Sequence, residues 1–270
     1  MNWTDDDCIV LEAGDYTIGL LDDDLERMRK TLRGMGDTGI KIEYLMNSFP
    51  RHTETLHAAM VAKRLVTLAE FETFVRETGQ ITEAEKDGWG WTWEDGWLKK
   101  AGVSWRAPFG DAADAMYRDN AERIPVLQAT WNDADAFCAW RSAEWGRAIC
   151  LPSESEWEVF ASRAGVFRAD EAGRVIERHA YDSSEAFCDA LLRAIDAAGG
   201  VHPPGLVWEW TSDWFQPYPG GACNREYGEV YRVLRGGSLV SHPFQKMREY
   251  RFRRCPTARS PFYGFRLASD

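Results

Sequence analysis

The sequence predicts an α+β fold that is rich in loops, with short antiparallel sheets and several helices. Three observations indicate this class. Amphipathic helical stretches begin at capping boxes, stretches of alternating apolar and polar residues are typical of strands, and one segment rich in tryptophan and glycine lacks helical periodicity. The 270 residues contain no internal repeat and no low-complexity linker. We therefore expect a single domain over residues 1–270.

The first elements are expected near the beginning of the chain. Residues 8–20, CIVLEAGDYTIGL, alternate around Gly14 and predict two strands joined by a turn at residues 13–15. The following stretch, DDDLERMRKTLRGMG, has apolar residues at helical spacing, acidic residues at its start and basic residues toward its end. It predicts a helical insertion near residues 20–35 that ends at Gly34.

Capping boxes mark the beginnings of the central helices. They pair Thr67 with Glu70, Thr82 with Glu85, and Ser153 with Glu156. Another helix begins at Thr130 or Asn132 and ends near Gly146. A second helical insertion is expected over residues 164–202, because apolar residues recur at helical spacing between residues 187 and 195. The tryptophan-rich residues 89–105 predict a long loop, which is either a recognition surface or a latch over the core.

The C-terminal part combines expected strands with a basic, aromatic stretch. VWEWTSDWF and YRVLRGGS predict strands, and YRFR at residues 250–253 alternates rings with arginines. On a strand, Tyr250 and Phe252 would share one face and Arg251 and Arg253 the other. The arginines either form a groove for anionic or aromatic groups, or pair internally with acidic side chains and stack on tryptophans.

The composition opposes several partner classes. The chain has 43 acidic and 32 basic residues and a net charge of −11, which opposes binding to nucleic acid. No apolar run approaches the length of a membrane span, and the first residues do not resemble a signal peptide. The six cysteines form no CxxC pair, so the usual zinc spacing is absent. We expect a cytoplasmic protein with free thiols, no nucleic-acid partner and no membrane association.

An ordered set of stretches resembles the formylglycine-generating enzyme, or sulfatase-modifying factor, family. The stretches are PRHTETL, VTLAEFETFVRETGQITEAEKDGW, IPVLQATWNDADAFCAWRSAEWGRAICLPSESEWEVFASR, GLVWEWTSDWF, RVLRGGS, and YRFR through GFRLA. They keep the family's order over roughly residues 10–270. The resemblance implies the family's C-type-lectin-like α+β fold, although a shared fold does not by itself fix a function.

The chain departs from this family where its catalytic members act. The resemblance implies a cysteine pair shortly after RGGS that binds copper and attacks a substrate cysteine. Here no cysteine lies between Cys223 and Cys255. Copper is not expected, because Ser241, His242 and Lys246 supply no soft sulfur ligand.

The other metals of the family are also in question. In GLVWEW, Leu206 stands where the family has an asparagine beside its calcium site, although Glu209 remains. The helical insertion also replaces the family's usual calcium-site loop. The iron-binding HxxxHxE motif of the related sulfoxide synthases is not matched, since His52 and His57 would lie about 140° apart on a helix. We expect no cofactor, with calcium or iron as alternatives.

These departures favour a pseudoenzyme that binds or scaffolds a peptide or protein partner through a C-terminal groove. Its predicted ligand-binding residues are Trp208, Glu209, Trp210, Asp213, Trp214, Ser238, His242, Arg251, Arg253 and Tyr263. Trp214 and Asp213 are included because the resemblance places their strand beside the substrate groove. Ser238 and His242 are the only catalytic candidates, and no orienting acid can be named for them.

Two other functions stay open. One is a metal-dependent, oxygenase-like oxidoreductase whose ligands come from His202, Glu209, Asp213 and His242. Within this set, Glu209 and His242 are the first candidates for metal ligands. The other function is an accessory subunit that completes a site together with a partner chain.

Overall fold

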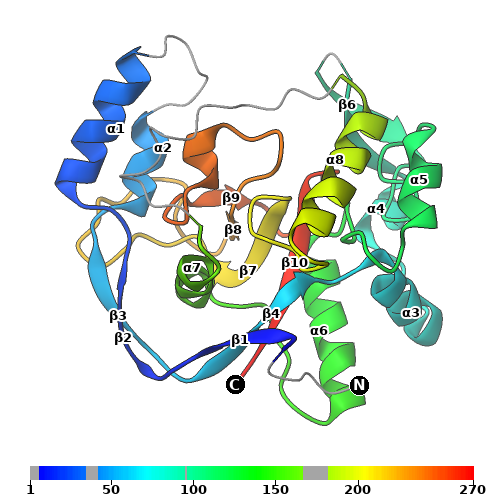
Figure 1. Ribbon diagram of the computed structural model, residues 1–270, viewed down its shortest axis with the longest axis horizontal. Coiled ribbons are helices and arrows are strands. Elements are labelled where there is room, and N and C mark those ends of the chain that lie inside the picture. The colour runs from blue at the N-terminus through cyan, green and yellow to red at the C-terminus, as the bar shows by residue number, and fades with distance from the viewer. Residues whose placement is uncertain (1–5, 35–41, 95, 167–181) are drawn as a thin grey trace.

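The computed structural model describes residues 6–34, 42–94, 96–166 and 182–270. A six-stranded sheet forms its centre, and its strands lie in the order β1-β4-β10-β7-β8-β9 (Figure 1). The strands are β1 (Cys8–Leu11), β4 (Ala59–Leu65), β10 (Tyr263–Ser269), β7 (Trp208–Trp214), β8 (Arg232–Arg235) and β9 (Phe252–Arg254). β10 runs antiparallel to β4 and parallel to β7, whereas the other pairs in this sheet are antiparallel. The fold is therefore mixed α+β, as the sequence predicts.

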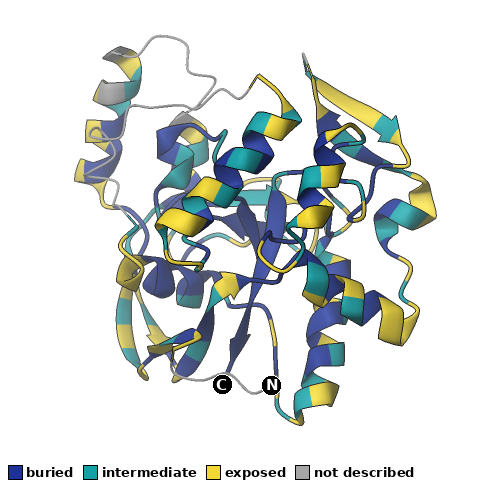
Figure 2. Cartoon of the chain, turned by 45° about the vertical axis from the view of Figure 1, so that its right-hand side comes forward, coloured by how far each residue is buried: buried dark blue, intermediate teal, exposed yellow. Residues whose placement is uncertain are grey.

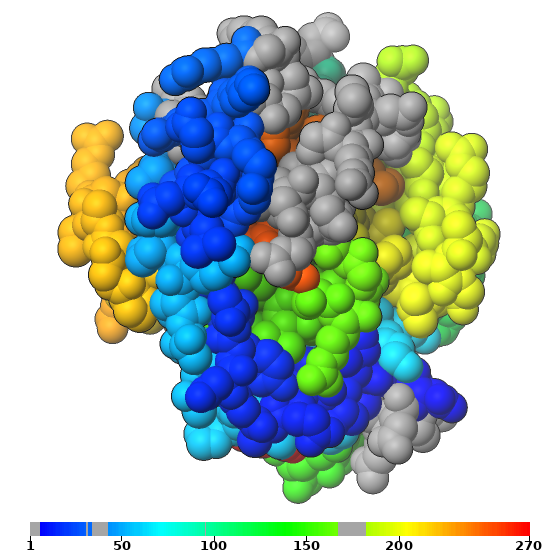
Figure 3. All heavy atoms as spheres, turned by 60° about the vertical axis from the view of Figure 1, so that its left-hand side comes forward, coloured from blue at the N-terminus to red at the C-terminus, as the bar shows by residue number. Residues whose placement is uncertain are grey.

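Helices and two small sheets surround this centre. The helices are α1 (Asp22–Gly34), α2 (Ile42–Leu45), α3 (Leu68–Thr78), α4 (Glu83–Asp87), α5 (Ala113–Asp119), α6 (Trp131–Trp145), α7 (Glu154–Arg163) and α8 (Ser184–Ala197). The small sheets pair β2 (Gly14–Ile18) with β3 (His52–Leu56), and β5 (Trp89–Trp93) with β6 (Trp97–Ala101). On the face in Figure 3, the N-terminal strands lie against α7. The central strands are buried, and the exposed residues lie on the outer faces of the helices and on β6 (Figure 2).

The capping boxes predict the helix beginnings correctly. The hydroxyls of Thr67, Thr82 and Ser153 each accept a hydrogen bond from the backbone N–H of the glutamate three residues later. The helix at residues 131–145 begins at Thr130 rather than Asn132, and it ends at Gly146, whose φ of 64° is left-handed. In the second predicted insertion, α8 is helical, whereas residues 167–181 lie outside the described residues.

Removing the cap of α6 tests this assignment. Thr130 is fully buried, and its Oγ1 both accepts from the Asp133 N–H and donates to the Asp133 carboxylate. We expect Thr130→Ala to lower the free energy of unfolding in urea by about 1–2 kcal/mol. Thr53→Ala, at an exposed position on β3, is the control. Equal losses in the two variants would contradict the capping role.

Two predictions near the beginning and middle of the chain are wrong. β1 and β2 do not pair with each other, because β1 joins β4 and β2 joins β3. Each strand thereby buries an apolar side chain, Leu11 or Ile18, in a small cluster with Val61 and Phe160. The pairing thus follows the apolar surface on distant segments rather than the local turn.

The tryptophan-rich segment is a hairpin rather than a long loop. Its tryptophans alternate with Gly90 and Thr92, which face the interior. A Cβ at Gly90 would lie 2.5 Å from a methyl group of Val103, so only glycine allows this approach. Gln128 is buried beneath it and donates from Nε2 to the backbone oxygen of Trp91 at 2.6 Å. The hairpin is therefore fixed to the core at its base.

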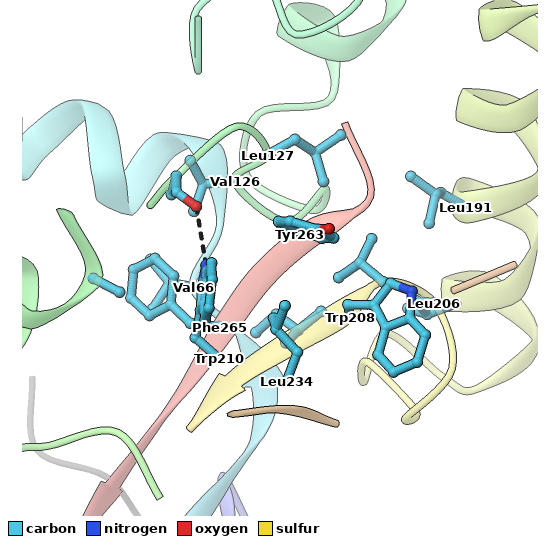
Figure 4. Close-up of a cluster of buried hydrophobic side chains, with 14 of the residues drawn as sticks. Val66, Val126, Leu127, Leu191, Leu206, Trp208, Trp210, Leu234, Tyr263 and Phe265 are labelled. Carbon is cyan, nitrogen blue, oxygen red and sulfur yellow. Dashed lines mark hydrogen bonds between the residues drawn. The ribbon is translucent and has the colours of Figure 1, made fainter. Parts of the chain in front are cut away.

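The main core lies where β7 and β10 run side by side. Figure 4 shows Trp208, Trp210 and Phe265 among aliphatic side chains, and the Val66 N–H donates to Phe265 O at 2.9 Å. Phe265 also meets Phe137 of α6 at 5.5 Å between ring centroids. Each such buried side chain stabilises the fold by about 1.5–3 kcal/mol relative to exposure. Trp208 and Trp210, which are among the predicted ligand-binding residues, are thus core residues.

Candidate functional site

A buried ionic network lies beneath the ends of β8 and β9. Arg251 donates from Nε and Nη2 to the two carboxylate oxygens of Glu154, at 2.7 and 2.6 Å. Arg235 donates from Nη2 to Glu158 Oε2 at 2.5 Å, and its guanidinium lies 3.7 Å from Glu154. Both arginines are buried, and both lie beside the Tyr218 hydroxyl or ring. For Arg251, the structure therefore shows internal pairing rather than a surface groove.

A second buried ion pair joins Glu209 on β7 to Arg266 on β10. The Arg266 guanidinium forms a fork on the Glu209 carboxylate, whose Oε2 also accepts from Trp157 Nε1 at 2.7 Å. Both side chains are inaccessible to solvent. Leu206, at the position of the family's asparagine, is buried in the core. These contacts do not fit a calcium site, because both carboxylate oxygens of Glu209 already have protein donors.

Asp213 is the acidic group with the clearest perturbation at this end of β7. Its Oδ2 accepts from the Glu154 N–H, the first residue of α7, at 2.6 Å. Burial raises the pKa of Asp213 to about 7, and the nearby Glu154 charge adds to the rise. Asp213 therefore changes its charge near neutral pH, although nothing in its contacts makes it part of a catalytic pair.

Ser238 and His242 are buried, and each makes a local contact. The Ser238 hydroxyl lies 3.0 Å from the Ser241 hydroxyl, and its backbone N–H donates to the same oxygen at 2.9 Å. His242 Nδ1 accepts from the Phe244 N–H at 3.3 Å. A hydroxyl partner does not supply a general base to Ser238.

The predicted ligand-binding residues divide into a buried and a partly exposed group. Seven are buried: Trp208, Glu209, Trp210, Ser238, His242, Arg251 and Tyr263. Asp213 and Trp214, at the end of β7, and Arg253, in the middle of β9, remain partly exposed. Arg253 makes an ion pair with Glu226. The buried group belongs to the interior of the fold, and only the partly exposed group can meet a partner without rearrangement.

The residues proposed as metal ligands have other roles. His202 Nδ1 accepts from the Leu65 N–H at 2.9 Å, and its Nε2 lies 2.7 Å from Arg123 O. Burial lowers the pKa of His202 to about 4, so the ring is neutral with both nitrogens in use. Among the described residues, no three His, Cys, Asp or Glu side chains are grouped so that they could hold a metal ion. The ligand set of His202, Glu209, Asp213 and His242 is therefore not brought together.

The copper chemistry of the family has no sulfur ligands at the expected place. All six cysteines are free, and Cys223 and Cys255, which flank the stretch after RGGS, are exposed. Cys138 and Cys188 are buried on their helices, and burial raises the pKa of the Cys188 thiol to about 12.

Over the described ranges, no helix is long and apolar enough to cross a bilayer.

Sequence reasoning missed two arginines at this end of the sheet. Arg232 of β8 lies between the rings of Trp131 and Trp214, and Arg254 of β9 lies over Phe252. The alternation in YRVLR carries a signal, because Arg232 and Arg235 must face opposite sides of a strand. The sequence does not show which side chains lie next to each face of this strand, because that depends on the order of the strands in the sheet.

The fold and this site define a sulfatase-modifying-factor domain. Residues 2–270 match the family described as "Sulfatase-modifying factor enzyme 1-like domain". The chain belongs to this family.

Its curated relatives include both active and inactive proteins. It is 30% identical to the formylglycine-generating enzyme of Streptomyces coelicolor, over 82% of this chain and 81% of that protein. It is 31% identical to the "Inactive C-alpha-formylglycine-generating enzyme 2" of Mus musculus, over 76% of this chain and 73% of that protein. A hercynine oxygenase of Mycobacterium tuberculosis is 28% identical, and the match covers 84% of this chain and 56% of that protein.

Solved structures agree on the fold. PvdO from Pseudomonas aeruginosa superposes with a TM-score of 0.60 at 22% identity, over 97% of this chain and 94% of that one. Treponema denticola variable protein 1 gives a TM-score of 0.53 at 17% identity, over the same shares. At these identities the likeness shows the architecture alone.

Proposed function

We propose that this protein is a non-catalytic member of the family that binds a peptide or protein segment at the outer ends of β7, β8 and β9. One observation carries the proposal. The stretch after RGGS, where the catalytic members are expected to hold their cysteine pair, contains serine hydroxyls, a capping histidine and buried aromatic rings. Cu(I) requires soft ligands that these side chains do not provide.

The relatives support a role of this kind. The Mus musculus relative at 31% identity is described as inactive, so loss of the reaction has a precedent within the family. The binding part of the proposal rests on the partly exposed aromatic and charged side chains beside the sheet. Trp214 offers rigid aromatic contact area, which is frequent in binding hot spots, whereas the Arg253 guanidinium is already paired with Glu226.

The oxidation of a cysteine-containing peptide tests the catalytic half. We expect the purified protein, incubated with Cu(I) in air, to form no aldehyde on the peptide by mass spectrometry. The Streptomyces coelicolor relative serves as the positive control. Aldehyde formation that disappears in Cys223→Ser or Cys255→Ser would overturn the proposal, because it would show that these two exposed thiols supply the missing ligands.

Capture of a partner from the source cell tests the binding half. Trp214→Ala should reduce the amount of co-purified partner, since it removes a partly exposed ring. Leu21→Ala is the matched control, because Leu21 is an exposed apolar residue that precedes α1. Equal capture by the wild type and both variants would place the binding surface elsewhere.

A further inference from the structure

Two arginines lie directly opposite each other at the edge of the central sheet. Arg232 on β8 is the Cα partner of Arg254 on β9, and on its other side Arg232 is the partner of Trp214 on β7. Residues that are paired across strands project to the same face of a sheet. The row Trp214, Arg232 and Arg254 therefore shares one face.

These two arginines differ in their partners from three other arginines of the sheet. Arg235, Arg253 and Arg266 each have a carboxylate within ion-pair distance. Among the described residues, neither Arg232 nor Arg254 has one. Arg232 Nη1 donates to Ser212 O at 2.6 Å, and Arg232 Nε is buried without a hydrogen-bond partner. Arg254 Nη1 donates to Arg253 O at 3.0 Å, and the Arg254 side chain also hydrogen-bonds the Tyr263 side chain.

Aromatic rings hold both guanidinium groups in place. The Arg232 guanidinium carbon lies 3.6 Å from the ring centroid of Trp131 and 3.5 Å from that of Trp214. The Arg254 carbon lies 4.1 Å from the Phe252 centroid. Stacking occupies the flat faces of a guanidinium, whereas its N–H donors point outward in the plane. The aromatic rings therefore orient the guanidinium groups without occupying their N–H donors.

The charges at this place favour an anion. Two like charges directly opposite each other across strands are destabilising. Asp135, Asp213 and Glu229 act on Arg232 from beyond ion-pair distance, and burial lowers the pKa of Arg232 despite them. An oxyanion between the two guanidiniums would offset their repulsion and accept the unused donors. A carboxylate matches the planar fork of arginine with two parallel hydrogen bonds.

We infer that Arg232 and Arg254, flanked by Trp131 and Trp214, form a binding site for a carboxylate of an acidic peptide segment. This inference rests on the proposed function and deepens it, because it names the chemistry of the bound segment. A groove for anions was one of two interpretations of Arg251 and Arg253. In the structure those two arginines pair with Glu154 and Glu226, whereas within the described ranges Arg232 and Arg254 are the cations of this sheet edge without a carboxylate partner.

Titration of the full chain with hexaglutamate tests the site, with hexaglutamine as the neutral control peptide. Binding is read from the fluorescence of the tryptophans that flank Arg232. We expect hexaglutamate to bind and hexaglutamine not to bind, and we expect affinity for hexaglutamate to fall with added salt. Arg254→Gln and Arg232→Gln should each weaken hexaglutamate binding by about tenfold or more.

Arg225→Gln, at an exposed arginine outside the sheet, is the matched control and should change the affinity by less than about twofold. Circular dichroism checks the fold of each variant. Arg254 is exposed, so its variant keeps the test valid if Arg232→Gln unfolds.

Two results would overturn the site. One is equal binding of hexaglutamate by the wild type and both site variants. The other is tighter binding of a phosphoserine peptide than of hexaglutamate, lost in Arg254→Gln, which would assign the pair to phosphate. The cysteine-oxidation assay is independent of this titration. If the protein neither binds hexaglutamate nor oxidises cysteine, the carboxylate site is overturned, but the proposal of a non-catalytic protein is not.

Discussion

Replacing Arg266 by methionine is expected to lower the free energy of unfolding by about 3–5 kcal/mol, because it leaves the Glu209 carboxylate buried without its cationic partner. Arg266 Nη2 donates to Glu209 Oε1 at 2.8 Å, and its Nε donates to the other carboxylate oxygen. Arg266 Nη1 also donates to Ala62 O at 2.7 Å, which ties β10 to β4. The variant therefore loses a buried ion pair and a link between two central strands.

Urea unfolding followed by fluorescence measures this loss. Arg193→Met is the matched control, because Arg193 and its partner Asp189 are both exposed on α8, and it should change stability by less than about 1 kcal/mol. Adding Glu209→Gln to Arg266→Met should recover part of the loss, since no charge then remains buried. A loss no larger than that of the control would show that this pair does not hold the sheet together.

The stability of the wild type relative to Asp213→Asn is expected to fall as the pH rises from about 4 to about 7. The folded-state pKa of Asp213 is raised from 3.8 to about 7, so in this window the folded protein holds a proton that the unfolded chain has lost. A difference of one in pKa between the folded and unfolded states corresponds to about 1.4 kcal/mol. Because Asp213 is only half-buried, we expect about 1–3 kcal/mol rather than the full amount.

Unfolding curves at pH 4.5 and pH 8 check this sign. Asparagine keeps an oxygen that can accept from the Glu154 N–H, so the two proteins should be nearly equal at pH 4.5. At pH 8 the asparagine variant should be the more stable one. Asp119→Asn, at an exposed site, should show no such pH dependence. A wild type that gains stability over Asp213→Asn with rising pH would contradict the raised pKa of Asp213.

Local chemistry made most helices predictable from the sequence. A capping box such as Thr67 with Glu70 is complete within four residues, and the left-handed end at Gly79 needs only the absence of a side chain. The hairpin at residues 89–101 was missed although its tryptophans alternate with period two, because the glycines suggested a loop. Its stability depends on Gln128 and Val103, which the local sequence does not reveal.

The site was less predictable, because its contacts join distant parts of the chain. Internal pairing of the arginines was one of two interpretations, and the structure shows it for Arg251 through Glu154, 97 residues away. Nothing in the sequence indicates that Arg232 would face Arg254 rather than an acid. That outcome depends on the register of β8 against β9, which tertiary packing sets.

The position of β10 in the middle of the sheet has a consequence for biosynthesis. β10 separates β4 from β7, although residues 263–269 follow both strands in the chain. On the ribosome, at about 5–20 residues per second, the earlier strands emerge long before the strand that joins them. Until then each nascent half presents an open backbone edge, which is prone to aggregation. The six-stranded sheet can therefore form only after residues 263–269 have been synthesised and have entered between β4 and β7.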